Sequence, residues 1–200
     1  MAFKPTAYPR MELKTTTFPQ RNFAGFREAR RLLELAPGQT ITVLQAGPGL
    51  AVRFLGRLGG AWRLLERVVR RLPLPDSFFE SYETADLLGA FDGIDVRLTI
   101  VDVNPRPLNV IAGQLRSADL RTIIVDLGAP LSPQLAPLAG TFDMVVAMAV
   151  VGRISPKERR QRAAANLAML ARQGGLIFAN QGDFSSSGCV LVGPAIYRKS

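Results

Sequence analysis

Three groups of residues follow apolar runs of this 200-residue sequence, where they could meet a ligand. The turn Gly47-Pro48-Gly49 comes after the run at residues 40–44. Its glycines would let the backbone approach a ligand and turn sharply into a helix, whose N-terminal amides favour a negative group. Asp102 ends the next run, and a carboxylate there can accept two hydrogen bonds from a ribose diol. Asp126 ends the third run, where its side chain could meet an adenine amino group. In this order, the three groups favour a ligand that carries a nucleoside.

Each group also has a simpler interpretation, which the sequence leaves open. The glycine turn could be any tight connection between a strand and a helix. Asp102 could cap the helix that is expected to begin near Pro105, because Asp is a favoured residue at helix N-termini. Asp126 precedes Gly128 and Pro130, so it could be an ordinary turn residue.

The elements that would position these residues alternate between strands and helices. Continuous apolar runs predict strands at residues 40–44, 96–103, 122–125, 142–147 and 175–179. Helical spacing predicts helices at residues 22–35, 107–117 and 156–171. The link from Asn180 to Cys189 is too short for a helical crossover, so the runs 189–192 and 195–197 predict an antiparallel addition at the sheet edge. We therefore expect an α/β fold with a doubly wound, mostly parallel seven-stranded sheet and an antiparallel C-terminal edge strand.

The chain is long enough for one domain with a substantial core. We expect that domain at residues 22–200, after an extended or disordered arm at residues 1–21. A helical insertion at about residues 60–92 interrupts the alternation of strands and helices. Its basic stripe predicts a solvated helix face, and the functional alternative is a lid or a recognition element for an anionic partner.

The residues around the three groups resemble the motifs of class I S-adenosylmethionine methyltransferases. Residues 43–49 resemble motif I, residues 100–104 the acidic motif of the second strand, and residues 141–146 the entry to the fourth strand. Residues 125–127 lie where these enzymes contact adenine, and residues 170–177 resemble the segment before the fifth strand. The resemblance implies a Rossmann-like fold, S-adenosyl-L-methionine as cofactor, and methyl transfer. The cofactor contacts that it implies are Gln45, Ala46, Gly47, Pro48, Gly49, Asp102, Val103, Asp126, Leu127 and Ala147.

The C-terminal half resembles the catalytic domain of chemotaxis-receptor glutamate methyltransferases. The length and rhythm of residues 175–184 and 192–199 carry this resemblance, with a short link to a final hairpin. The Arg-Asn pair that the family has after its fourth strand is Met148-Ala149 here. The family's separate N-terminal helical domain has no counterpart in these residues. The resemblance therefore concerns the fold, and receptor methylation is not carried over.

Two departures from motif I keep alternatives to catalysis open. Position 45 holds Gln where the class usually has an acid, so this side chain cannot pair with a cationic methionine group. Ala51 stands in place of the third glycine. A binding module with the same fold, for a protein or a nucleic acid, is therefore the first alternative function. A nucleotide-dependent oxidoreductase is the second, although Val52 stands where its fingerprint requires glycine.

Methyl transfer needs an aligned acceptor and, for a hydroxyl or an amine, a general base. The sequence has no histidine to serve as that base. Asp183 and Gln181 are candidate acceptor-side residues, and Arg153 is a candidate anchor for an anionic substrate. The acceptor itself, whether small molecule or protein, is not specified by these residues. No motif indicates a metal site.

The charge balance is basic, with 25 Lys and Arg against 16 Asp and Glu and a net charge of +9. An arginine-rich composition spread along the chain explains this more simply than a dedicated interface. Nucleic acid remains a candidate partner through Arg63, Arg67, Arg70 and Arg71. The single cysteine, Cys189, cannot form an internal disulfide, which fits a reducing compartment and leads us to expect a cytoplasmic location. No apolar run is long enough for a membrane span.

Overall fold

A computed structural model describes residues 22–52, 75, 78–115, 120–148 and 150–200. The expected arm at residues 1–21, the expected insertion up to residue 74 and the four arginines proposed to bind nucleic acid lie outside these ranges. Within them, no helix has the length and apolar character needed to cross a bilayer.

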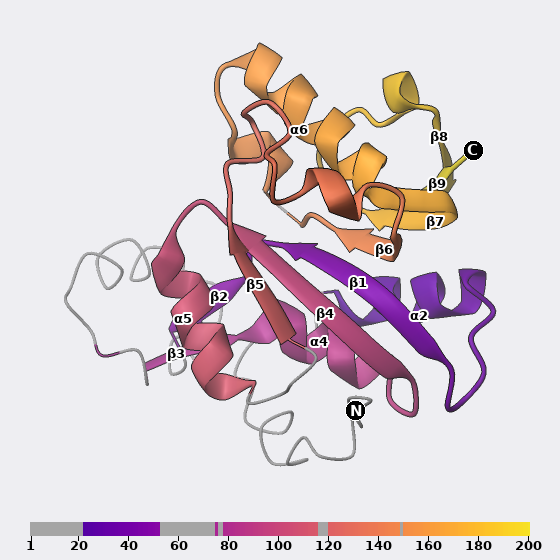
Figure 1. Cartoon of the computed structure of the whole chain (residues 1–200). Coiled ribbons are helices and arrows are strands. Elements are labelled where there is room, and N and C mark those ends of the chain that lie inside the picture. The colour runs from indigo at the N-terminus through magenta and orange to yellow at the C-terminus, as the bar shows by residue number, and fades with distance from the viewer. Residues whose placement is uncertain (1–21, 53–74, 76–77, 116–119, 149) are drawn as a thin grey trace.

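A seven-stranded sheet forms the centre of the molecule, in the order β5-β4-β1-β6-β7-β9-β8 (Figure 1). The strands are β1 (Thr40–Ala46), β4 (Asp95–Asp102), β5 (Leu120–Ile124), β6 (Phe142–Val146), β7 (Ala171–Phe178), β8 (Cys189–Gly193) and β9 (Ile196–Lys199). The first five pair in parallel, whereas β9 runs antiparallel to both β7 and β8. The predicted fold class is confirmed: the sheet is doubly wound and mostly parallel, and its C-terminal hairpin makes the antiparallel edge.

Helices cover both faces of this sheet (Figure 1). One face carries α2 (Phe23–Leu32), α4 (Tyr82–Ala90) and α5 (Pro105–Gln114), and the other carries α6 (Lys157–Leu170). Each face has its own apolar core, with Phe26, Leu87 and Ile111 in the first and Leu135, Leu167 and Phe184 in the second. Strands buried on both faces need continuous apolar runs, which explains why the sequence pattern predicted them.

Strand β1 shows how one run serves both cores. Ile41 and Val43 point to the core under α2 and α4, and Leu44 and Ala46 point to the core under α6. Because side chains alternate along a strand, Gln45 shares the face of Ile41 and Val43 and is directed toward α4. The strand continues two residues further than its apolar run predicted, so Gln45 and Ala46 belong to β1 and not to the turn.

Asp143 connects three strands at the edge of the sheet opposite the candidate ligand turn. Its Oδ2 accepts hydrogen bonds from the Thr42 amide and hydroxyl at 2.7 Å, and its Oδ1 accepts one from Arg172 Nε at 2.6 Å. Burial acts to raise the pKa of Asp143, but these hydrogen bonds and the Arg172 charge outweigh it, and the pKa falls below its ordinary value. The residue therefore joins β1, β6 and β7, in a structural role.

Candidate functional site

The strand order reverses at β1, which has β4 on one side and β6 on the other. In doubly wound sheets, the chain segments that follow two such strands leave their carboxyl ends in opposite directions, and the loops between them generally form a crevice. The described residues that follow these strand ends are 47–49 after β1, 103–104 after β4, and 147–148 and 150 after β6. Ligands of doubly wound sheets bind at such a point.

The glycine turn adopts backbone angles that favour glycine, with φ of +74° at Gly47 and +60° at Gly49. A Cβ at Gly47 would lie 3.2 Å from a methyl group of Val150 and 3.7 Å from Oδ2 of Asp102. The Gly47 amide donates to the Val101 carbonyl at 2.8 Å, which ties the turn to β4. The absence of a side chain at Gly47 thus brings its backbone close to the Asp102 carboxylate.

Asp102 is the last residue of β4, and its two oxygens have separate surroundings. Oδ1 accepts a hydrogen bond from the Asn104 amide at 2.8 Å, while Oδ2 faces Gly47. The helix cap is Asn104, whose side chain accepts from the Arg106 amide at 3.0 Å. Asp102 therefore does not cap α5, and the simpler interpretation of this residue is wrong. The neighbouring Val103 is 67% exposed, which places an apolar side chain at the surface beside the carboxylate.

The turn leads into a strand, and the expectation that it opens a helix is wrong. Leu50–Val52 forms β2, which pairs antiparallel with β3 (Phe79–Ser81). Helix α4 begins directly after β3, at Tyr82. In the described residues that directly follow Gly49, the chain is therefore a strand, and no helix N-terminus presents its amides there.

A buried polar cluster lies behind the turn, and its α4 members were not predicted as site residues. Gln45 Oε1 accepts from the Thr84 hydroxyl at 2.9 Å, and Gln45 Nε2 lies 3.4 Å from Glu83 Oε1. The Ser81 hydroxyl lies 2.6 Å from that of Thr84 and also donates to the Pro48 carbonyl. These contacts connect β1, the turn and α4 through side chains that are all buried.

Two carboxyl groups of this region titrate abnormally. Burial raises the pKa of Glu83 well above its ordinary value. The hydrogen bond from Gln45 lowers this pKa, the negative charge of Asp86 raises it further, and the positive charge of Arg153 lowers it. Burial also raises the pKa of Asp86 to about 6, against a weaker effect of its hydrogen bond from the Asn22 amide. Perturbed groups beside a candidate ligand turn are a common feature of functional sites.

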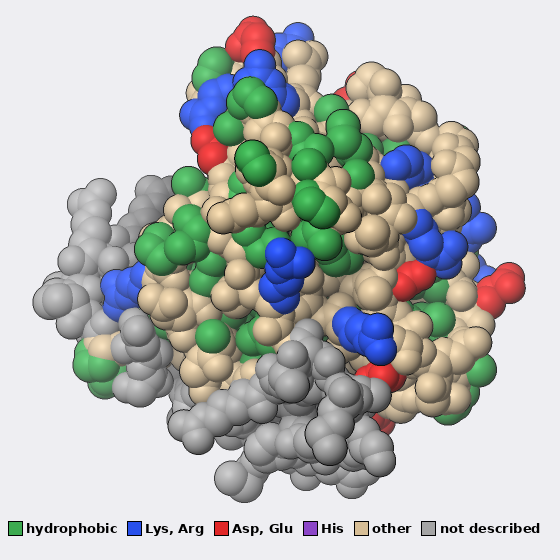
Figure 2. Space-filling view, in the orientation of Figure 1, with side chains coloured by type: hydrophobic (Ala, Val, Ile, Leu, Met, Phe, Trp, Pro, Cys, Tyr) green, Lys and Arg blue, Asp and Glu red, His purple; other side chains and the backbone are tan. Residues whose placement is uncertain are grey.

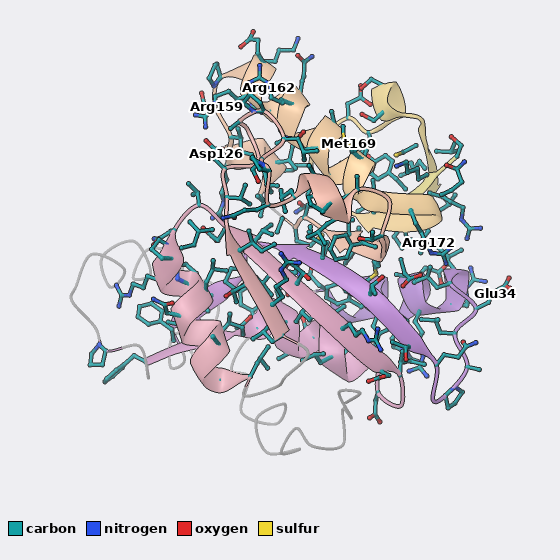
Figure 3. The ribbon with its side chains drawn as sticks, in the orientation of Figure 1. Glu34, Asp126, Arg159, Arg162, Met169 and Arg172 are labelled. Atoms are coloured by element: carbon teal, nitrogen blue, oxygen red, sulfur yellow. The ribbon has the colours of Figure 1, made fainter. Side chains whose placement is uncertain are left out.

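Asp126 is already engaged by other protein groups. Its Oδ1 accepts from the Gly128 amide at 2.9 Å, and its Oδ2 forms an ion pair with Arg159 of α6 (Figure 3). Asn166 fixes the same loop, since its buried amide donates at 2.9 Å to the carbonyls of Leu127 and Ala129. A ligand amino group would have to share the Asp126 carboxylate with Arg159.

The loops after β6 and β7 hold the remaining predicted residues. Ala147 is fully buried, and its amide donates to the Phe178 carbonyl at 2.8 Å. Arg153 is an exposed residue of the 3-10 turn η5 (Val151–Arg153), and the Gln181 side chain occupies the space where a Cβ of Gly152 would lie. Asp183 Oδ1 accepts from the Ser185 amide at 2.9 Å, which is a local turn contact. Arg153 is thus brought near Glu83, whereas Asp183 has a structural partner.

Basic side chains gather around the N-terminal end of α6 on the face shown in Figure 2. Lys157, Arg159, Arg160 and Arg162 are exposed there, although Arg159 pairs with Asp126. Among the residues that the structure describes, no group of three or more His, Cys, Asp or Glu could hold a metal ion.

No family model matches the chain, and no curated protein sequence matches it. Several solved structures are similar at low identity. They include the [4+2]-cyclase SpnF, 15% identical over 87% of this chain and 59% of that one, with a TM-score of 0.48. The N-methyltransferase NodS from Bradyrhizobium japonicum WM9, in complex with S-adenosyl-L-homocysteine, is 14% identical over 84% of this chain and 70% of that one, with a TM-score of 0.46. A protein from Rhodobacter sphaeroides, provisionally assigned as a Zn-dependent alcohol dehydrogenase, is 21% identical over 78% of this chain, with a TM-score of 0.44. This chain spans 47% of that protein's length and 59% of the cyclase's.

Proposed function

We propose that the chain binds S-adenosyl-L-methionine at the turn after β1 and transfers its methyl group to an acceptor, either a small molecule or a protein. One observation carries the proposal above the others. The Asp102 carboxylate ends β4 beside the backbone of Gly47, at the point where the strand order reverses. A carboxylate in that position suits a ribose diol, because it can accept a hydrogen bond from each hydroxyl.

The residues around the turn fit the nucleoside part of this cofactor. Asp102 Oδ2 faces Gly47 and is therefore directed to the ligand side of β4, where it would hold the ribose. Val103 offers an exposed apolar side chain on which the base could lie. Gly47 leaves open the space that a Cβ would fill between Val150 and Asp102. Leu127 is buried and helps to shape the loop that carries Asp126.

When bound, the cofactor would supply an electrophilic methyl group to an acceptor lone pair that approaches opposite the sulfur. The sulfur would keep the electrons of the broken bond, and a hydroxyl or amine acceptor would give its proton to a base or to water. The chain's own contribution is mainly to hold the two reactants in line. Arg153, exposed at η5 and close enough to act on Glu83, is positioned to attract an anionic acceptor. We further propose that the insertion, about residues 60–92, takes part in acceptor recognition, and that residues 1–21 form an arm outside the domain at residues 22–200.

Calorimetric titration with S-adenosylmethionine and S-adenosylhomocysteine tests the proposal. We expect micromolar binding of one or both, weakened about 30- to 100-fold by Asp102→Ala, because two hydrogen bonds to a charged group are lost. Asp92→Ala is the matched control. Asp92 is an exposed aspartate just before the N-terminal end of β4, whereas Asp102 lies at the other end of that strand. NADH serves as the control ligand for an oxidoreductase. Binding of NADH alone, or of none of these ligands at millimolar concentration, would contradict the proposal.

A further inference from the structure

The acid that motif I usually carries at position 45 is replaced by Gln, yet a carboxyl group from another element lies beside the end of this Gln side chain. Glu83 lies in the first turn of α4, 38 positions further along the chain, and its Oε1 is 3.4 Å from Gln45 Nε2. Glu83 is only 2% exposed, so its carboxyl group is almost fully buried. The cluster of Gln45, Ser81 and Thr84 holds the start of α4 against β1 and thereby fixes where this carboxyl lies.

The carboxyl group is directly behind the backbone of Gly49. A Cβ at Gly49 would lie 2.5 Å from the Glu83 Cβ and 2.9 Å from its Oε2. Any side chain at position 49 would therefore displace Glu83, whereas glycine leaves the carboxyl separated from the turn by backbone alone. Gly47 stands in a similar relation to Asp102, whose Oδ2 would be 3.7 Å from its Cβ. The two glycines of the turn thus each have one carboxyl group beside them.

This arrangement suits a ligand with two different ends. A diol at the Gly47 end would meet Asp102, and a cation at the Gly49 end would feel the field of Glu83. That field is strong if the carboxyl is ionised, because charges interact more strongly in a buried setting than in water. The described charged groups that face Glu83 are Asp86 on α4, which disfavours its ionisation, and Arg153 on η5, which favours it. Burial favours the neutral form.

We propose that Glu83 replaces the acid absent from position 45 and makes the turn selective for a cationic amino group at the end of its ligand. The inference rests on the proposed function, in which that group is the ammonium of the cofactor's amino-acid end. Glu83 acts through the field behind Gly49, so it is a specificity-determining residue and not a catalytic one. Since burial holds the free carboxyl neutral, a bound ammonium would draw it into the ionised form. Binding therefore releases a proton and tightens as the pH rises.

Three probes separate this inference from the proposed function. S-adenosylhomocysteine carries the ammonium without the sulfonium, S-adenosylmethionine carries both, and 5′-methylthioadenosine carries neither. We expect Glu83→Gln, which keeps the shape and the contact with Gln45, to weaken the first two ligands about tenfold or more. The binding of 5′-methylthioadenosine stays the same. Glu158→Gln, an exposed glutamate in the first turn of α6, is the matched control and changes none of the three.

The pH profile adds a result that a purely structural role would not produce. Between about pH 6 and pH 7.5, where an amino group remains mostly protonated, S-adenosylhomocysteine binds the wild type more tightly as the pH rises. Glu83→Gln abolishes this trend. Asp86→Asn removes the negative neighbour of Glu83, and so the trend shifts to lower pH, which gives a second variant with an unchanged Glu83.

The outcomes are distinct. If 5′-methylthioadenosine binds but Glu83→Gln leaves S-adenosylhomocysteine unaffected, the assignment of Glu83 is overturned and the proposed function survives. Loss confined to S-adenosylmethionine would place the sulfonium, and not the ammonium, at Glu83 and would also overturn it. Failure of all three ligands to bind the wild type would overturn the proposed function itself.

Discussion

Asp86 makes the stability of this fold depend on pH in a direction that can be calculated. The carboxyl is 5% exposed, and its described partner is the Asn22 amide, which donates at 3.4 Å. Burial raises its pKa from 3.8 to about 6 in the folded chain. The folded state therefore holds a proton that the unfolded state releases, and the free energy of unfolding falls as the pH rises from about 4 through 6. The difference between these two pKa values lowers the free energy of unfolding by about 3 kcal/mol once the carboxyl is fully ionised in both states.

Replacement of Asp86 by Asn removes this loss while keeping the shape and an oxygen that accepts from Asn22. We expect the variant to gain stability over the wild type by an amount that grows by about 1.5 kcal/mol between pH 5 and pH 8. In a chain of this length, that growth raises the melting temperature by about 3–6 °C. Any cost of burying the new amide that does not depend on pH changes the stability difference by the same amount at pH 5 and at pH 8 and leaves its growth unaltered.

Urea unfolding of the two proteins across that pH range measures the difference directly. Glu83 lowers the free energy of unfolding of both proteins as the pH rises. The difference between the two proteins at each pH therefore reports the ionisation of Asp86 together with the interaction between Asp86 and Glu83. Asp92→Asn, at an exposed aspartate, should give a curve parallel to the wild type. A difference between Asp86→Asn and the wild type that does not change with pH would refute the reasoning, because it would mean that this carboxyl is solvated in the folded chain.

Two further predictions concern the frame of the site. Gly49→Ala should cost at least about 1–2 kcal/mol, because the left-handed backbone and the Glu83 side chain both oppose a Cβ, and ligand binding should fall with it. Gly113→Ala in α5, where a Cβ would meet nothing within 4 Å, should instead stabilise the chain by about 0.5–1 kcal/mol, and urea unfolding measures both changes. Asn166→Ala leaves two loop carbonyls without their donor and should cost about 1–3 kcal/mol in urea unfolding, whereas Gln161→Ala, at an exposed position of the same helix, should cost far less.

The sequence predicted those parts of the fold that depend on apolar runs. Strands such as β6 and β7 are buried on both faces, so their composition alone distinguishes them, and the polar residues at their ends follow from that placement. The β2–β3 pair was missed because three residues are too few to show a period. Glu83 was missed for a different reason: nothing in its local spacing separates a buried glutamate from a solvated one. The absence of an acid at position 45 was the available signal, since it raised the question of which residue could supply the charge instead.

The pairing of β2 with β3 also affects which changes of sequence the fold can accept. Leu50 lies opposite Ser81 and Val52 opposite Phe79, so the segment between these strands begins and ends at the same place in the fold. The free-energy cost of closing such an excursion grows slowly with its length, by about 0.6 kcal/mol for each doubling. The segment between these strands can therefore lengthen, shorten or be exchanged while the turn, Asp102 and α4 keep their positions. For protein engineering, the β2–β3 pair is therefore an insertion site at which the intervening segment can be replaced by a different recognition element.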